Sequence, residues 1–215
     1  MGRRALVAGA TGLVGRELLA ALLADSDYAE VLCIGRRAPA VSHAKLACLS
    51  VDFSALPPLP RIDDCYVALG TTIKVAGSQA AFRAVDFDAV VATAKAARAS
   101  GAMKLGVISA MGADPRSRLF YSRVKGEMEQ AVAALGYESV VIVRPSFLAG
   151  DRSDLAQPPR LGERWVMAAL QRMAPLIPVN YRAISPQQVA RALLASVKAG
   201  RPGVQRILSG QARGF

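Results

Sequence analysis

Short apolar runs alternate along the chain with stretches in which apolar residues recur every three or four positions. The apolar runs predict strands over residues 4–8, 31–34, 45–51, 65–69, 104–108, 139–143 and 204–208. The periodic stretches predict helices over residues 16–24, 78–100, 121–135, 162–173 and 186–198. Strands that alternate with helices are typical of a parallel sheet with helices on both faces. We therefore predict an α/β fold, a doubly wound parallel sheet of the Rossmann type, whose ligands bind beyond the carboxyl ends of the strands.

The length of 215 residues fits one domain. We expect a single domain over residues 1–215, in which residues 145–200, approximately, form a small lobe on the substrate side. The helical pattern breaks over residues 150–160, where charged residues, glutamine and two prolines predict a loop. We find no linker long enough to separate an independent second domain.

The composition excludes several classes of protein. Apolar residues make up 53% of the chain, which is too many for a disordered protein. No apolar run reaches the roughly 18–20 residues of a membrane span, and the first residues lack the long apolar region of a signal peptide. A cytoplasmic location is therefore expected. The three cysteines and the single histidine, His43, are not clustered as metal ligands are, so no metal site is expected.

The formal net charge is +11, and the excess of basic residues is concentrated in the last third of the chain. Such a charge suggests an anionic ligand or partner. Binding of nucleic acid is disfavoured, because the arginines are scattered and lack the interleaved aromatic residues of a single-strand platform. A solvated basic surface is the alternative interpretation.

Three glycines, Gly9, Gly12 and Gly15, lie between the first predicted strand and the first predicted helix. Glycine at such a turn lets the backbone approach a pyrophosphate, and the helix N-terminus offers free N–H groups and a partial positive charge. The spacing alone is a weak signal, but its place in a strand–turn–helix unit indicates dinucleotide binding. The alternative is a tight turn without a ligand.

The end of the second predicted strand distinguishes NADP from NAD. An NAD site typically has an acidic residue there, which binds the ribose 2′-hydroxyl. This strand ends instead in Arg36 and Arg37, whose guanidinium groups match a 2′-phosphate. We therefore expect NADP, with NAD less favoured. The alternative is that both arginines simply face solvent.

Tyr121 and Lys125 stand four residues apart on one predicted helix and so share a face. A nearby ammonium group lowers the pKa of a phenol, which would let Tyr121 exchange a proton with a carbonyl or alcohol oxygen. Ser109, at the end of the preceding strand, could hydrogen-bond the same oxygen. A core tyrosine beside a surface lysine is the alternative for this common spacing.

Five motifs together resemble the atypical short-chain dehydrogenase/reductases, and especially the family of Tat-interacting-protein oxidoreductases and their small bacterial relatives. The motifs occupy residues 9–15, 69–72, 109–114, 121–127 and 144–146, and the likeness spans roughly residues 4–200. The resemblance implies an NADP(H)-binding domain with Tyr121 as proton donor and Lys125 as its partner, Lys125 also holding the nicotinamide ribose. The cofactor contacts that it implies are Gly9, Thr11, Gly12, Leu13, Val14 and Gly15 at the pyrophosphate, Asp52 and Phe53 near the adenine, Leu69, Gly70 and Thr71 along the ribose, and Arg144, Pro145 and Ser146 near the nicotinamide.

Two positions depart from the family pattern. Ala110 stands where many relatives have a second serine, and Asp86 stands where longer relatives often have asparagine. Two functions therefore stay open. One is NADP(H)-dependent oxidoreduction of a small carbonyl or alcohol substrate, and the other is a regulatory or interaction protein that binds NADP(H) with little or no turnover. Helices beside the tyrosine often pair in related dimers, so a homodimer is compatible with either function.

Overall fold

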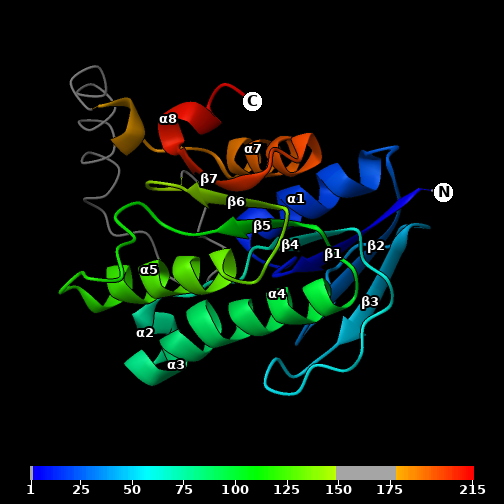
Figure 1. The fold of residues 1–215 in the computed structure, drawn as a ribbon, viewed down its shortest axis with the longest axis horizontal. Helices are drawn as coiled ribbons and strands as arrows, with labels where there is room; N and C mark the ends of the chain where they lie inside the picture. Colours follow the sequence, from blue (N-terminus) through cyan, green and yellow to red (C-terminus); the bar gives the residue numbers. More distant parts are fainter. Residues whose placement is uncertain (1, 149–177) are drawn as a thin grey trace.

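The structure is a computed structural model that describes residues 2–148 and 178–215. Its centre is a sheet of seven parallel strands in the order β3-β2-β1-β4-β5-β6-β7 (Figure 1). The strands are β1 (Arg3–Ala8), β2 (Tyr28–Gly35), β3 (Leu46–Ser50), β4 (Asp64–Val67), β5 (Lys104–Ile108), β6 (Ser139–Arg144) and β7 (Gly203–Leu208). The predicted α/β fold with a Rossmann-type sheet is confirmed. The strand order reverses between β1 and β4, which is where ligands bind in sheets of this kind.

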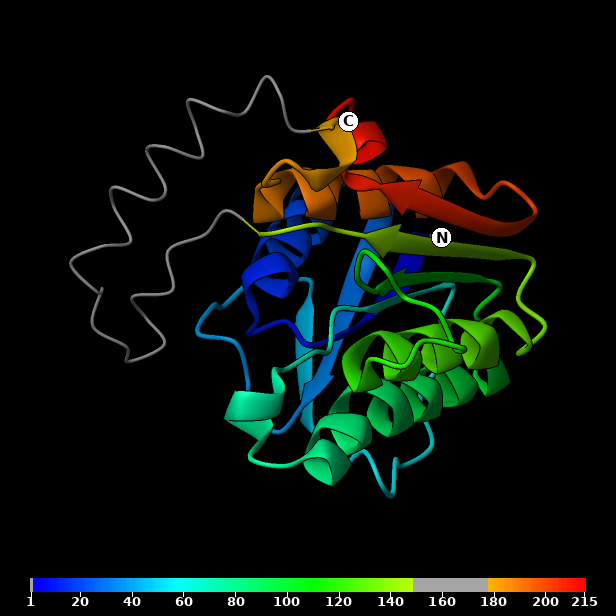
Figure 2. The same ribbon diagram turned by 90° about the vertical axis from the view of Figure 1, so that its left-hand side faces the viewer.

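Helices cover both faces of the sheet. Helices α1 (Leu13–Ala24) and α7 (Pro186–Ala199) pack side by side on one face, and α4 (Val90–Ala99) and α5 (Phe120–Ala133) pack on the other (Figures 1 and 2). Each face has its own buried core, with Leu18 and Leu193 in the first and Val90 and Met128 in the second. The amphipathic pattern of the sequence thus buries one stripe of each helix against the strands.

The long helix predicted over residues 78–100 is divided into three parts. It consists of α3 (Gln79–Arg83), a π-helical turn η1 (Ala84–Ala89) and α4. The Ser78 side chain begins the segment by accepting a hydrogen bond from the Ala81 N–H. A π-helical turn holds an extra residue and often occurs at functional sites. Here the turn carries the buried side chain of Asp86.

Three short elements were not predicted, because a periodic pattern of apolar residues can be recognised only over more than one helical turn. They are α2 (Ile73–Ala76), the 3-10 turn η4 (Val179–Tyr181) and α8 (Ser209–Ala212). The helix predicted over residues 162–173 lies outside the described residues, as does most of the predicted substrate lobe. The described α7 packs against β5 and β6. The division into one domain with a lobe stays a prediction.

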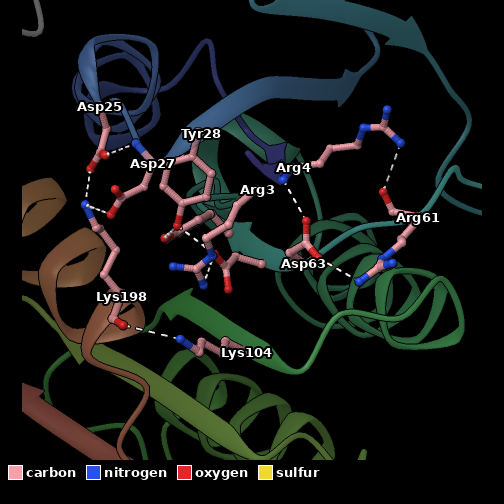
Figure 3. A network of polar contacts seen from close by, with 11 residues as sticks. Arg3, Arg4, Asp25, Asp27, Tyr28, Arg61, Asp63, Lys104 and Lys198 are labelled. Carbon is pink, nitrogen blue, oxygen red and sulfur yellow. Dashed lines mark hydrogen bonds and ion pairs between the residues drawn. The ribbon is translucent and has the colours of Figure 1, made fainter. Parts of the chain in front are cut away.

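The strands' amino ends are joined by a polar network, which Figure 3 shows from close by. The buried Tyr28 hydroxyl donates to Asp64 Oδ2 at 2.7 Å and lies 2.7 Å from the Tyr66 hydroxyl. Arg3 forms an ion pair with the same Asp64 oxygen. At the rim, the Lys198 ammonium group reaches Asp25 Oδ2 at 2.6 Å. This network lies at the amino ends of the strands. Sheets of this kind bind ligands at the opposite, carboxyl ends.

Two of the three cysteines lie in the core. Cys33 and Cys65 are buried, whereas Cys48 is exposed on the edge strand β3, and all three are free thiols. Across residues 2–148 and 178–215, no group of histidine, cysteine or acidic residues is arranged to hold a metal ion. In the same residues, no helix has the length and hydrophobicity needed to cross a membrane.

Candidate functional site

The turn between β1 and α1 is built by close backbone packing. Gly9 has φ +89°, and a Cβ atom there would lie 2.5 Å from the Ala68 carbonyl group at the end of β4. A Cβ atom on Gly15 would lie 1.9 Å from the Gly9 oxygen. Any side chain at these two positions would push the turn away from both strands. These glycines therefore fix the position at which α1 begins.

The N-terminus of α1 is open to an anion. Gly12 caps the helix without a side-chain hydrogen bond, and the first turn contains no acidic residue. Thr11 and Gly12 are exposed, Leu13 is half-buried and Val14 is buried. Free N–H groups and the helix dipole at this point favour a phosphate group. The six predicted pyrophosphate residues thus lie together at this turn, where Thr11 and Gly12 face solvent, and their contact with a diphosphate stays a prediction.

The predicted adenosine residues lie beyond the neighbouring strands. Arg36 and Arg37 follow β2 and are both exposed, and no carboxylate of the described residues pairs with either. Asp52 follows β3, where its Oδ1 accepts a hydrogen bond of 2.9 Å from the Ser54 N–H. This hydrogen bond lowers the pKa of Asp52. Phe53 is half-buried against the core.

The end of β4 is linked to the π-helical turn. Leu69 and Thr71 are half-buried and Gly70 is exposed, so this predicted ribose segment forms part of the surface. The Thr71 N–H donates to Asp86 Oδ2 at 2.9 Å. A Cβ atom on Gly70 would meet Asp86 Oδ1 at 3.5 Å and the Lys125 ammonium nitrogen at 3.9 Å. The segment therefore passes directly over an ion pair between these two side chains.

Lys125 and Asp86 form a buried ion pair. The Lys125 nitrogen lies 2.7 Å from Asp86 Oδ1, and the two side chains are 5% and 1% exposed. Two buried charges are tolerated in a protein interior when they neutralise each other and find further polar contacts. Sequence reasoning identified Lys125 as a site residue but did not identify its carboxylate partner.

Tyr121 lies one turn before Lys125, at the surface end of α5. Its side chain is 38% exposed, and its ring packs against that of Phe82 with centroids 5.4 Å apart. Burial, and then the negative charge of Asp86, raise the pKa of Tyr121 to about 12. The predicted lowering of this pKa by Lys125 is wrong in direction, because burial of the phenol and then the negative charge of Asp86 raise it.

Ser109 and Arg144 belong to a second cluster, which is centred on Glu129. The Ser109 hydroxyl donates to Glu129 Oε1 at 2.6 Å, and Arg144 donates to both Glu129 oxygens at 2.8 and 2.6 Å. Arg206 of β7 adds a contact of 3.2 Å. Hydrogen bonds to Glu129 raise the pKa of Arg144. Ser109 thus contacts a carboxylate, and no contact with Tyr121 is found.

Glu129 and Arg206 were missed by sequence reasoning. Glu129 stands four residues after Lys125 and eight after Tyr121, so the three share one face of α5. A carboxylate in the buried stripe of a helix requires a cation nearby, and this signal was available from the sequence. Arg206 offered no signal, because its contact with Glu129 depends on how β7 docks.

Pro145 and Ser146 connect the end of β6 to later segments. The Pro145 carbonyl accepts a hydrogen bond of 3.0 Å from the Met111 N–H. The Ser146 hydroxyl donates to the Arg182 carbonyl at 2.6 Å, and the Ser146 N–H donates to the Ser209 hydroxyl at 2.7 Å. These two predicted nicotinamide residues therefore hold the loop after β6 in place.

Comparison with known proteins gives curated relatives but no family model that matches the chain. Protein fmp52 of Emericella nidulans, which is named as mitochondrial, is 37% identical over 177 residues, covering 77% of this chain and 75% of the relative. FMP52 of Coccidioides immitis, also named as mitochondrial, is 35% identical and covers 69% of this chain and 67% of that protein.

Solved structures show where the fold recurs. A short chain dehydrogenase family protein from Francisella tularensis has a TM-score of 0.71 at 16% identity, covering 98% of this chain and 99% of that one. MoeE5 in complex with UDP-glucose and NAD has a TM-score of 0.69 at 18% identity, covering 95% of this chain and 76% of that one. At these identities the likeness shows the fold alone, the Rossmann-type sheet with flanking helices that these two proteins share with this chain.

The expected cytoplasmic location is contradicted by the curated FMP52 relatives. The names of these relatives place them in mitochondria. A location signal is read by a receptor or translocation machinery and does not depend on the features of a folded domain. Composition and hydropathy therefore gave no valid basis for the expectation.

Proposed function

The chain belongs to the FMP52 family, and from that premise we propose that it is an NADP(H)-dependent oxidoreductase of the short-chain dehydrogenase/reductase type. The substrate is a small carbonyl or alcohol compound. One observation carries the proposal. The open N-terminus of α1 and the Lys125–Asp86 ion pair occupy the carboxyl ends of the adjacent strands β1 and β4, with Tyr121 one helical turn away.

The residues at the glycine turn support a bound dinucleotide. An uncapped helix and an exposed Gly12 fit a diphosphate, and the exposed Arg36 and Arg37 fit a 2′-phosphate. MoeE5, a protein of the same fold, binds NAD according to its structure. A preference for NADP is our proposal for this chain, and it rests on the two arginines.

NADPH supplies the hydride when it is bound. In our proposal, Lys125 donates a hydrogen bond to the nicotinamide ribose while Asp86 holds its ammonium group in place. Tyr121 exchanges a proton with the substrate oxygen from its partly exposed position. The Ser109 hydroxyl, which donates to Glu129 in the structure, turns toward the substrate oxygen in the reaction. Arg144, Pro145 and Ser146 border the nicotinamide.

The narrower resemblance to the Tat-interacting-protein oxidoreductases is part of this proposal. The curated relatives carry the FMP52 name, and that name states no activity. The same holds for the predicted lobe over residues 145–200 and for a homodimer, neither of which the described residues test.

A second function is favoured by one observation. Ala110 is 9% exposed and lacks a hydroxyl, and the neighbouring Ser109 hydroxyl is bound to Glu129. A site without a free hydroxyl beside Tyr121 would bind the dinucleotide and turn over slowly. The alternative is therefore an NADP(H)-binding regulatory or interaction protein.

Two measurements separate these functions. NADPH oxidation is followed with a panel of aldehydes, ketones and quinones, and the cofactor affinity is measured by calorimetry. We expect turnover that Tyr121→Phe abolishes and that the matched control Tyr137→Phe, at a tyrosine two residues before β6 whose hydroxyl donates to the Ala94 carbonyl, preserves. Tight NADPH binding without oxidation would support the regulatory alternative. Failure to bind either dinucleotide would refute both.

A further inference from the structure

Two cysteines stand directly opposite each other on neighbouring strands. In the pairing of β2 with β3, Cys33 is the register partner of Cys48. Register partners in a parallel pair carry their side chains on the same face of the sheet, because side chains alternate along both strands. Leu46, two positions before Cys48, packs against the buried cluster that contains Cys33. Both thiol groups therefore belong to the face of the sheet that α1 and α7 cover.

The backbone spacing of neighbouring strands suits a disulfide. Such strands lie about 4.7–4.9 Å apart, and the Cα atoms of disulfide-linked cysteines lie about 4.4–6.8 Å apart. The Cβ atoms of a disulfide are closer, at about 3.5–4.5 Å, so the bond requires a small approach of the two strands. β3 is the edge strand of the described sheet, and β2 is its one neighbour. Movement of β3 toward β2 therefore separates it from no other strand.

The two thiols differ in their access to solvent. Cys48 is exposed, so a dissolved reagent can reach its sulfur, whereas Cys33 is buried. Burial, and then a negative charge on Cys48, raise the pKa of Cys33 to about 12. The thiolate is the nucleophilic form of cysteine. Cys48 should therefore react first with a reagent, and Cys33 should react only with its neighbour.

We propose that Cys33 and Cys48 form a thiol–disulfide site that oxidised glutathione, a low-molecular-weight disulfide, converts to an intramolecular disulfide. The Cys48 thiolate attacks one sulfur of oxidised glutathione, which forms a mixed disulfide and releases one glutathione thiolate. Cys33 then loses its proton to solvent and attacks the Cys48 sulfur, which releases the second glutathione. The two cysteine thiols lose two electrons, and one oxidised glutathione is reduced to two glutathione molecules.

Closure of the bridge competes with the return of free glutathione to the mixed disulfide. The raised pKa of Cys33 leaves about one molecule in 10⁴ as the thiolate at pH 8. A well-oriented neighbouring group, however, acts at an effective concentration of about 10⁵ M or more. Free glutathione in the assay is millimolar. Proximity therefore outweighs the small thiolate fraction, and the mixed disulfide should proceed to the bridge.

Cys65 provides an internal control. It is buried in the cluster on the opposite face of the sheet, and β1 separates its strand from β2. Its register partners are Leu6 and Leu105, so it has no cysteine beside it in the sheet. Oxidation should therefore give a single bridge, between Cys33 and Cys48, and leave Cys65 as a thiol.

The test is oxidation of the reduced protein by oxidised glutathione, with acid quenching, thiol counting under denaturing conditions and peptide mapping by mass spectrometry. We expect the three free thiols to fall to one, with Cys33 linked to Cys48 in a monomer. Cys33→Ala should stop at the mixed disulfide on Cys48, and Cys48→Ser should not react. The matched control Cys65→Ala should form the bridge as the unmodified protein does.

Several results would overturn the inference. They are a mixed disulfide on Cys48 that persists in the unmodified protein, a covalent dimer through Cys48, a bridge that includes Cys65, and the absence of any reaction. The peptide map of the unmodified protein is decisive even if a variant does not fold.

The thiol–disulfide site goes beyond the proposed function, although its two strands lead into the proposed adenosine contacts, Arg36 after β2 and Asp52 after β3. Peptide mapping requires neither a dinucleotide nor a substrate. Formation of the bridge in a protein that binds no NADPH would support the site and refute the oxidoreductase. Turnover of NADPH in a protein that forms no bridge would do the reverse.

Discussion

Replacement of Lys125 by methionine tests whether its ion pair with Asp86 lies in a truly dry interior. Methionine keeps most of the length of the lysine side chain and removes the ammonium group. It leaves Asp86, which is 0% exposed, with the Thr71 N–H as its one remaining hydrogen-bond donor among the described residues. Loss of one partner of a buried ion pair costs about 3–5 kcal/mol, because the other charge stays buried without compensation.

Proton uptake sets an upper limit on this cost. A reference aspartate takes up a proton at pH 7 at a cost of about 4 kcal/mol, and at pH 5 at a cost of about 1.5 kcal/mol. In the variant, the Asp86 side chain adopts whichever form has the lower free energy, the ionised carboxylate or the protonated carboxyl group. Lys125→Met should therefore lower the free energy of unfolding by about 3–4 kcal/mol at pH 7 and by about 1.5 kcal/mol at pH 5. The folded variant binds a proton that the unfolded chain releases, so its deficit grows as the pH rises above about 4.

Urea unfolding at the two pH values measures both free energies. The matched control is Lys198→Met, which removes the partly exposed ion pair with Asp25. This change should cost less than about 1 kcal/mol, with little difference between pH 5 and pH 7. The double variant Asp86→Asn with Lys125→Met should recover most of the loss at pH 7, since no charge is left buried. A loss in Lys125→Met that is equal at both pH values would show that packing, and not charge burial, explains it, and our account of the ion pair would be refuted.

Three further predictions follow from the other strand ends. Arg36→Ala with Arg37→Ala should reduce the NADP-over-NAD preference by about 100-fold in binding calorimetry, the equivalent of two charge-assisted hydrogen bonds, and an unchanged ratio would remove both residues from the site. Gly15→Ala should destabilise the protein by about 1–3 kcal/mol in thermal unfolding and abolish dinucleotide binding, because its Cβ atom would lie 1.9 Å from the Gly9 oxygen; normal binding would contradict this. Glu129→Gln should cost about 1–3 kcal/mol in urea unfolding, between the values for exposed and buried ion pairs, and a cost near zero would indicate that water screens the cluster.

Much of the fold was predictable because its signals are local. The strand–glycine–helix succession at residues 4–24 depends on neighbours in sequence, and β5 (Lys104–Ile108) has the predicted bounds. Alternation of apolar runs with amphipathic stretches was enough to predict the parallel sheet. Chain connectivity then placed Tyr121 after β5 and Arg36 after β2, at the ends of their strands.

The pairing of charges was not predictable in the same way. Tyr121 and Lys125 share a helix face, and this follows from spacing alone. Whether Lys125 acts on Tyr121 depends on a carboxylate that arrives from another element, 39 positions earlier in the chain. The π-helical turn that presents Asp86 is itself a departure from regular spacing. The direction of the pKa shift of Tyr121 therefore required the three-dimensional structure.

The strand order also determines how charge is distributed along the carboxyl ends of the strands. Beyond β2 and β1 lie two arginines and an uncapped helix N-terminus, which together attract phosphate groups. Beyond β4, the charges of Asp86 and Lys125 cancel each other. The strand order places the first region beside the second, so in our proposal a dinucleotide held by its phosphates at β1 and β2 would extend its reactive ring toward the neutral pair.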